Sequence, residues 1–286
     1  MWWLLCAGVS AFVVTACAPG VADHRFGLDW GRAAAIGLEA PRIYPSVPKP
    51  LTAPITLAYR PLPPRRVAVD TWVEAGSGTF DQVRQEGRLT TESSGDGLVW
   101  TLEIGLKGEG GAPPGPRHTV RVETDSAGRL RGRPPELPVL RSADGATAAV
   151  PDPYGAVPPW PLPTGPVVQG GEFTRFEVPV PTEMRVNGAW VLLEPAPGGP
   201  GAPPARIAVT GTVLGEVNFL GRPALVVGFA GETAMRFGRA VYSGYAVHDI
   251  ETGAAQTSVS QLAVAGWHRG GVVPAHQAVT LRFQPE

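Results

Sequence analysis

The chain has 286 residues and a formal net charge of −1, and 43% of its residues are hydrophobic. This length allows one large β domain or two small ones, and this hydrophobic content is enough to bury a core. The nearly balanced charge gives no electrostatic basis for a nucleic-acid partner. The two cysteines, Cys6 and Cys17, both lie in the opening apolar stretch. The rest of the sequence therefore lacks the thiols needed for cysteine catalysis, disulfides or thiolate metal sites.

The first element is an apolar run over residues 2–16, "WWLLCAGVSAFVVTA". At about 15 residues it is shorter than the roughly 20 that a membrane-spanning helix needs, and it is typical of the h-region of a secretory signal. Its last letters together with the next residue, "VTAC", resemble the lipobox of bacterial lipoproteins. In that family the chain is cut before the cysteine and the thiol is diacylated. The resemblance implies a signal peptide over residues 1–16 and lipid attachment at Cys17.

Two alternatives to lipid attachment remain open: a buried N-terminal helix, or an ordinary signal peptide that contains a cysteine. The residue after Cys17 is Ala18. In Gram-negative lipoproteins an Asp at that position tends to retain the protein at the inner membrane. The resemblance therefore implies an outer-membrane protein that faces the periplasm, with the membrane as a partner through the N-terminal lipid.

The second predicted segment is a lipidated N-terminus and Pro-rich tether over residues 17–54. Its stretch "PRIYPSVPKPLTAPI" contains five prolines. Such a density of proline favours extended, semi-rigid chain of polyproline type. A tether of this kind would hold a folded domain away from the membrane surface.

From residue 55 onward the pattern is one of strands and turns, which predicts a β domain over residues 55–286. In "RVAVDTWV" the residues Val67, Val69 and Thr71 alternate with those between them, as on a strand with one buried face. The predicted strands up to residue 125 and at the C-terminus cover residues 66–73, 97–106, 118–125 and 278–283.

Residues 206–266 contain four further β-rich segments. The turn residues of "NFLGR" and "IETG" stand where hairpins would need them. In the third segment Val241, Tyr245 and Val247 alternate only imperfectly with Ser243 and His248, so the pattern does not assign the faces of this strand. The fold class predicted from all these segments is mainly β: an antiparallel curved sheet, open barrel or sandwich with few helices.

Pro-rich insertions interrupt the β domain near residues 131–166 and 195–204. Proline cannot donate to a sheet ladder, so these stretches are predicted to be loops or edges. One reading of these stretches is a PxxP ligand for an aromatic groove. Trp160 is flanked by prolines, and exposed on a loop it would be a candidate for contact with a partner. The alternative is that Trp160 pins its own loop within an ordinary insertion.

Two stretches, "WPLPTGPVVQGGEFTRFEVP" and "YAVHDIETGAAQTSVSQL", resemble the middle and the end of uncharacterised bacterial envelope proteins. In those proteins a strand ends in Asp, a turn of the form (D/E)xxTG follows, and another strand returns. They are related in shape to periplasmic lipoprotein carriers, whose curved sheet cradles acyl chains. The resemblance covers roughly residues 157–265 and rests on short, turn-dictated motifs.

No catalytic, metal or cofactor motif is found. Ser243, His248 and Asp249 are close in sequence, but adjacent strand residues point to opposite faces, so we interpret Asp249 as a turn residue. The five histidines show no ligand spacing, so no metal is predicted. The glycine-rich stretch 105–116 runs into prolines, whereas a phosphate cradle requires a helix N-terminus. No cofactor is predicted.

Large aromatic residues are the remaining candidates for ligand binding, with core packing as their alternative role. The candidates are Trp72, Trp100, Trp190, Phe229 and Tyr245. We expect a non-enzymatic, lipid-anchored envelope protein that binds an apolar ligand or an envelope partner. The alternatives are an assembly lipoprotein that docks through its sheet edge or Pro-rich loops and, ranked last, an envelope hydrolase.

Overall fold

The computed structural model describes residues 47–75, 79–107, 117–132, 140–141, 147–148, 161–180, 183–186, 189–193, 205–235, 238–268 and 271–286. Nearly all strands in these ranges belong to one antiparallel sheet, in which ten strands follow one another edge to edge. No helix lies within the described ranges. The predicted mainly-β fold with an open, curved antiparallel sheet is confirmed.

The first strands are β1 (Arg65–Ala75), β2 (Thr79–Ser94), β3 (Gly97–Leu106), β4 (His118–Asp125), β5 (Leu140–Arg141), β6 (Thr147–Ala148) and β7 (Glu172–Pro179). The remaining strands are β8 (Glu183–Val186), β9 (Ala189–Leu193), β10 (Arg206–Phe219), β11 (Arg222–Met235), β12 (Gly238–Asp249), β13 (Ala255–His268) and β14 (Gly271–Pro285). The short strands β5 and β6 pair with each other outside the main sheet.

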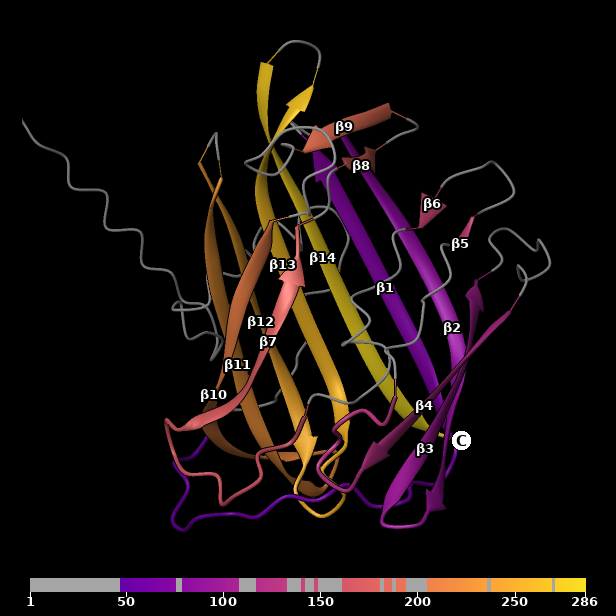
Figure 1. The fold of residues 1–286 in the computed structure, drawn as a ribbon, viewed down its shortest axis with the longest axis vertical. Coiled ribbons are helices and arrows are strands. Elements are labelled where there is room, and N and C mark those ends of the chain that lie inside the picture. Colours follow the sequence, from indigo (N-terminus) through magenta and orange to yellow (C-terminus); the bar gives the residue numbers. More distant parts are fainter. Residues whose placement is uncertain are drawn as a thin grey trace, which may run out of the picture.

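The order of strands across the sheet is β4-β3-β2-β1-β14-β13-β12-β11-β10-β7. The pairing of β1 with β14 joins the beginning of the sheet to the end of the chain, with Val67 opposite Phe283. The edge strands β4 and β7 do not pair with each other, so the sheet stays open. Figure 1 shows how it curves, with β2, β3 and β4 on one side and β7, β10 and β11 on the other.

Glycines in mid-strand let neighbouring strands approach closely where the sheet curves. A β-carbon on Gly87 would overlap the backbone oxygen of Glu103 on β3, and one on Gly244 would overlap that of Val259 on β13. A larger residue at either position would push the strands apart. These positions therefore support the strong curvature of the sheet.

The sheet buries side chains on both faces. A large inner cluster draws buried residues from all ten strands, which only the concave face can bring together. A small outer cluster on the convex face consists of Val217, Ala224, Val226, Tyr245, Val247 and Val259. Both faces of β12 are buried, and a register shift separates Val247 from His248. This explains why apolar and polar residues alternate imperfectly along that strand.

Two extended segments, residues 47–64 and 161–171, cross the lower end of the sheet in Figure 1, and we call them the belt. They bond to each other through Ile55 and Val167, with N–O distances of 3.0 and 2.7 Å. Lys49 exchanges two backbone hydrogen bonds with Glu216, both 2.8 Å. It thus pairs with β10 beyond the residues of that strand that pair with β7. The belt thus begins at one side of the sheet.

The belt then reaches strand ends that are far apart in sequence. The amide of Tyr59 donates to Ser126 O at 2.8 Å, and that of Arg60 donates to Thr252 O at 3.2 Å. The amide of Leu62 donates to Thr91 Oγ1 at 2.6 Å. The belt therefore connects β2, the turn after β4 and the β12–β13 turn at the lower end.

The upper end of the sheet carries the hairpin β8–β9. Strand β9 pairs with β13 through Leu192 opposite Trp267 and Leu193 opposite Gly266. Strand β8 lies against β1 and β2. In Figure 1 the hairpin crosses above the middle of the sheet, at the end opposite the belt.

Candidate functional site

The described candidate aromatics fall on two faces of the sheet. Trp100 is fully buried in the inner cluster, donates from Nε1 to Thr124 Oγ1 at 2.9 Å, and meets the ring of Tyr59 edge-on at 5.1 Å. Phe229 is also in the inner cluster, 5.8 Å from Phe176. Tyr245 belongs to the outer cluster. Trp100 and Phe229 thus share the concave face, and Tyr245 lies behind it.

The other candidates fall outside what the structure describes. The side chains of Trp72 on β1 and Trp190 on β9 lie outside the described part. Cys17 and Trp160 also lie outside the described residues, as do most of the Pro-rich insertions. Lipid attachment at Cys17 and partner contact at Trp160 stay predictions.

The structure separates Ser243 from His248. Ser243 shares its strand parity with Tyr245 and Val247 of the outer cluster, whereas the ring of His248 lies 4.9 Å from Phe173 of the inner cluster. Residues on opposite faces of a sheet cannot share a proton directly. These two side chains therefore do not form the nucleophile–base pair of a hydrolase.

His248 is a fully buried imidazole at the lower end of β12. Its Nδ1 lies 3.0 Å from the carbonyl oxygen of Gly253, which can only accept, so Nδ1 carries the proton. Burial lowers the pKa of His248 to about 4, so the ring is neutral near neutral pH. Its Nε2 has no hydrogen-bond partner within the described ranges.

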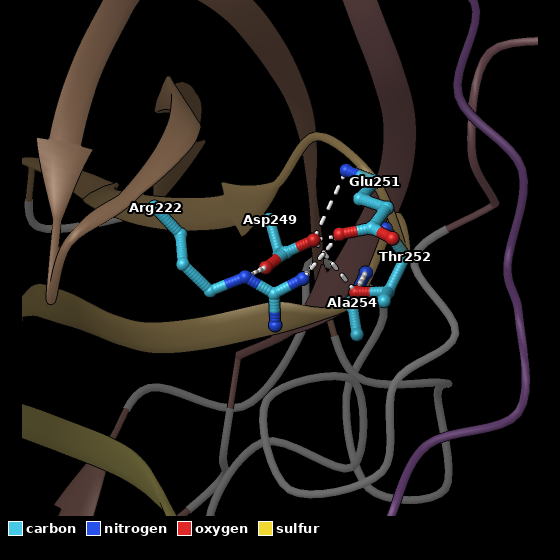
Figure 2. A network of polar contacts seen from close by, with 5 residues as sticks. All are labelled: Arg222, Asp249, Glu251, Thr252 and Ala254. Carbon is cyan, nitrogen blue, oxygen red and sulfur yellow. Dashed lines mark hydrogen bonds and ion pairs between the residues drawn. The ribbon is translucent and has the colours of Figure 1, made fainter.

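Asp249 organises the turn between β12 and β13 (Figure 2). Its Oδ1 accepts hydrogen bonds from the amides of Glu251 and Thr252 at 3.0 and 2.9 Å, and from Thr252 Oγ1 at 3.1 Å. A side chain that satisfies successive turn amides is the defining contact of an Asx-type turn. The interpretation of Asp249 as a turn residue is confirmed.

The other carboxylate oxygen of Asp249 faces arginine. Arg222 Nε lies 3.2 Å from Asp249 Oδ2, and its Nη2 also bonds to Glu251. The Asp249 side chain is 2% exposed, whereas that of Glu251 is 67% exposed. Burial lowers the pKa of nearby Arg65, and the negative charge of Asp249 raises it. The buried carboxylate is therefore held in a cationic environment.

The β12–β13 turn also contacts the belt. Gly253 has a φ of +69°, and a β-carbon there would press on Leu162 and on the backbone of Ala58, both belt residues. Thr252 O accepts from Arg60, as described above. The polar network around Asp249 thus holds the β12–β13 turn in the position that the belt requires.

The second distinctive region is the concave face between the belt and the β8–β9 hairpin, which we call the upper concave face. All its defining side chains belong to the inner cluster, and they come from five strands. They are Ile104, Val178, Ile207, Ala240, Tyr242 and Leu262, each at most 7% exposed. The belt hydrogen bonds to Ser126, Thr252 and Thr91 lie at the lower end, away from this region. These side chains form a buried apolar layer across the sheet.

Thr71 and Gln85 are two of the polar residues on this face, and the sequence alone did not indicate either as a site residue. Thr71 on β1 is 2% exposed and Gln85 on β2 is 1% exposed. The whole of β2 was missed, because its inward row includes Gln85, Gly87 and Thr91 and therefore has little apolar character. The sequence signal for Thr71 was the alternation along β1, which places Thr71 on the same buried face as Val67 and Val69.

No protein-family model matches the chain, and no curated protein matches its sequence. The described ranges contain no group of three or more His, Cys, Asp or Glu side chains placed to hold a metal ion. Within the same ranges, none of the structure forms an apolar helix long enough to cross a membrane. The site is therefore argued from its geometry.

Proposed function

We propose that this chain is a non-enzymatic cell-envelope protein whose upper concave face binds an apolar ligand. The observation that carries the proposal is the inner cluster, which spreads apolar side chains over the concave face of a ten-strand open sheet. Transfer of an acyl chain from water to such a surface is favourable by about 0.8 kcal/mol per buried CH₂ group. The curved shape supplies surface on more than one side of a bound chain.

The proposal includes attachment to the outer membrane through acylated Cys17. Its support is the apolar run that ends in "VTAC" and the absence of an acidic residue at position 18. Intact mass of the chain expressed in a bacterial host tests this directly. The wild type should carry acyl groups and fractionate with membranes, and a Cys17→Ser variant should do neither. An unmodified wild-type cysteine would refute the anchor without affecting the ligand proposal.

Docking to another envelope protein through a sheet edge is the second candidate, because β4 and β7 leave open edges. Both edges carry charged side chains, with Arg121 near Glu123 on β4 and Arg175 near Glu172 on β7. Charges along an edge strand discourage the addition of a further strand. We therefore rank edge docking below ligand binding.

Two alanines on opposite faces provide a matched test of ligand binding. Ala240 lies in the inner cluster and Ala224 in the outer cluster, with exposures of 0% and 1%. Ala240→Phe and Ala224→Phe add the same volume, and overpacking costs each roughly 1–3 kcal/mol of stability. Titration with a pyrene-labelled acyl chain should show weaker binding for Ala240→Phe alone. Equal binding by both variants, or no binding by the wild type, would reject the upper concave face as the site.

A further inference from the structure

Among the free edges of the sheet, that of β7 stands out as uncovered. Beyond the residues that pair with β7, β10 bonds to Lys49 of the belt. On the other side of the sheet, the carbonyl oxygen of Glu123 on β4 accepts from the amide of Arg131 at 2.8 Å. Next to it, Thr124 pairs with Leu130. No strand or isolated bridge of the described ranges pairs with the outer side of β7, which lies at the front in Figure 1.

The register of β7 with β10 decides which backbone groups of β7 point outward. The amide of Val180 donates to the carbonyl oxygen of Ala205 at 2.7 Å, so Val180 turns its backbone groups toward the β10 side. This direction alternates along an antiparallel strand, and Arg175, Glu177 and Pro179 therefore turn theirs to the open side. Proline fits there because an edge position requires no donated hydrogen bond. The N–H and C=O groups of Arg175 and Glu177 are not used by β10 and can pair with a further strand.

The side chains of the same two residues carry opposite charges on the convex face. Arg175 is 73% exposed and Glu177 is 59% exposed, whereas Phe176 and Val178 turn toward the inner cluster. An unrelated strand would meet both signs of charge within two positions, which discourages its addition. A second copy of this chain differs from an unrelated strand, because a twofold axis brings the same charges back in the opposite direction.

The charges select one register for β7 against itself. A twofold axis perpendicular to the sheet passes at one residue of β7, which then lies opposite its own copy. An axis at Arg175 or at Glu177 places like charges opposite each other, and an axis at Thr174 or Val178 leaves both charges without an opposite counterpart. An axis at Phe176 places Arg175 of each copy opposite Glu177 of the other. Since both residues turn their backbone groups outward, each such pair also exchanges two backbone hydrogen bonds.

We propose that β7 is a dimerisation edge, which pairs antiparallel with β7 of a second copy of this chain about an axis at Phe176. The pairing joins two curved sheets edge to edge. It extends an ion pair that each chain already has, because Glu177 lies 3.1 Å from Arg206 of its own chain and opposite Arg175 of the other copy. The inference goes beyond the proposed function and does not depend on it, since the pairing uses the backbone and the convex side chains of β7.

The test measures the mass of the full chain by sedimentation equilibrium in a density-matched detergent, over a range of protein concentrations. The wild type should form dimers as its concentration rises. Arg175→Glu and Glu177→Arg each place like charges opposite each other at both symmetric positions, so each should weaken dimerisation about 10-fold or more. The double variant Arg175→Glu/Glu177→Arg restores opposite charges between the copies and should dimerise more tightly than either single variant.

The double variant separates contacts between copies from contacts within one chain. Inside each chain it places like charges beside Glu172 and beside Arg206, the present partners of the two substituted residues. Recovery of the dimer therefore has to come from charges that meet across the interface. Arg121→Glu is the matched control, because Arg121 is also an exposed arginine beside a glutamate on an edge strand.

Three results would overturn the inference. The first is a wild type that stays monomeric at every concentration, and the second is a double variant that dimerises no better than the single variants. The third is a dimer that Arg121→Glu weakens as much as Arg175→Glu does, which would assign the interface to β4. Thermal unfolding verifies that each variant folds, as expected for substitutions of exposed residues. Failure to bind an acyl ligand would reject the proposed function and leave the dimer unaffected.

Discussion

Two pairs of polar residues at the two ends of the same curved sheet differ in how their hydrogen-bonding capacity is used. At the lower end, Asp249 accepts three hydrogen bonds and meets Arg222, and Thr91 both accepts from and donates to Leu62. On the upper concave face, Gln85 and Thr71 are as deeply buried but have no hydrogen bond among the described residues. Polar groups that are satisfied internally fix one conformation, whereas buried groups without a hydrogen bond lower the stability of the fold.

Under the proposed function this contrast divides the molecule by role, with stability supplied by the lower end, including the belt and the turn that it crosses, and binding by the upper concave face. If the division holds, substitutions at the lower end change the free energy of unfolding and leave ligand affinity unchanged. The following predictions test the division, and binding of the pyrene-labelled acyl chain is measured beside stability in each case.

The largest effect is expected for Asp249→Ala. The substitution removes three hydrogen bonds to a buried carboxylate and takes one of the two carboxylates from Arg222, which keeps Glu251. Hydrogen bonds to a charged group contribute about 1.5–3 kcal/mol each, so a loss of about 3–5 kcal/mol in total is expected by urea denaturation.

Glu251→Ala is the control for Asp249→Ala, because Glu251 contacts the same arginine but is 67% exposed. Exposed pairs contribute about 0–1 kcal/mol. Equal losses for the two variants would show that burial of the carboxylate is not what stabilises the turn.

An intermediate effect is expected from pH. Burial lowers the pKa of His248 from 6.5 to about 4, so between these two values the unfolded chain binds a proton that the folded chain excludes. The contribution of His248 to the free energy of unfolding is complete at pH values above its pKa in the unfolded chain. It is lost as the pH falls toward its pKa in the folded chain, and the total loss is about 3 kcal/mol. Stability followed by urea denaturation across this range should therefore decline toward acid.

The variant His248→Phe isolates this contribution. Phenylalanine keeps an aromatic ring beside Phe173 but does not titrate. The variant loses the hydrogen bond to Gly253 and is less stable than the wild type near neutral pH. Its stability should fall less steeply toward acid. An unchanged slope would assign the pH dependence to other groups.

The smallest effect is expected for Leu220→Asn in the β10–β11 turn at the lower end. Leu220 has a φ of +52° and is 74% exposed. Leucine adopts this left-handed conformation at a cost of roughly 1 kcal/mol, whereas asparagine tolerates it. Thermal unfolding should show a rise in melting temperature of a few degrees, as expected for about 1 kcal/mol. Leu220→Ala, which keeps the strain, should show no such rise.

Local turn chemistry made part of this structure predictable. The letters "NFLGR" and "IETG" marked the β10–β11 and β12–β13 turns correctly, because glycine and Asp249 have few other uses between apolar runs. The alternation of Val67, Val69 and Thr71 also placed those residues on one buried face. In each case the information lies within a few residues of the feature that it predicts.

The candidate site was less predictable, for identifiable reasons. Strand β2 faces inward with Gln85, Gly87 and Thr91, so it lacks the apolar alternation that marks a strand. Tyr245 was grouped with Trp100 and Phe229 as a ligand candidate, but parity places it on the convex face. Strand β12 is buried on both faces, which removes the polar–apolar contrast from which facing is inferred.

The sequence by itself determined the mainly-β class, the principal hairpins and the turn role of Asp249, because each depends on contacts between near neighbours. The tertiary structure decided which strands meet, and above all the pairing of β1 with β14, in which Val67 lies opposite Phe283. It also decided that Gln85 and Thr71 share one buried position. Those relations depend on the register of strands and the curvature of the sheet, which are set by packing over the whole chain.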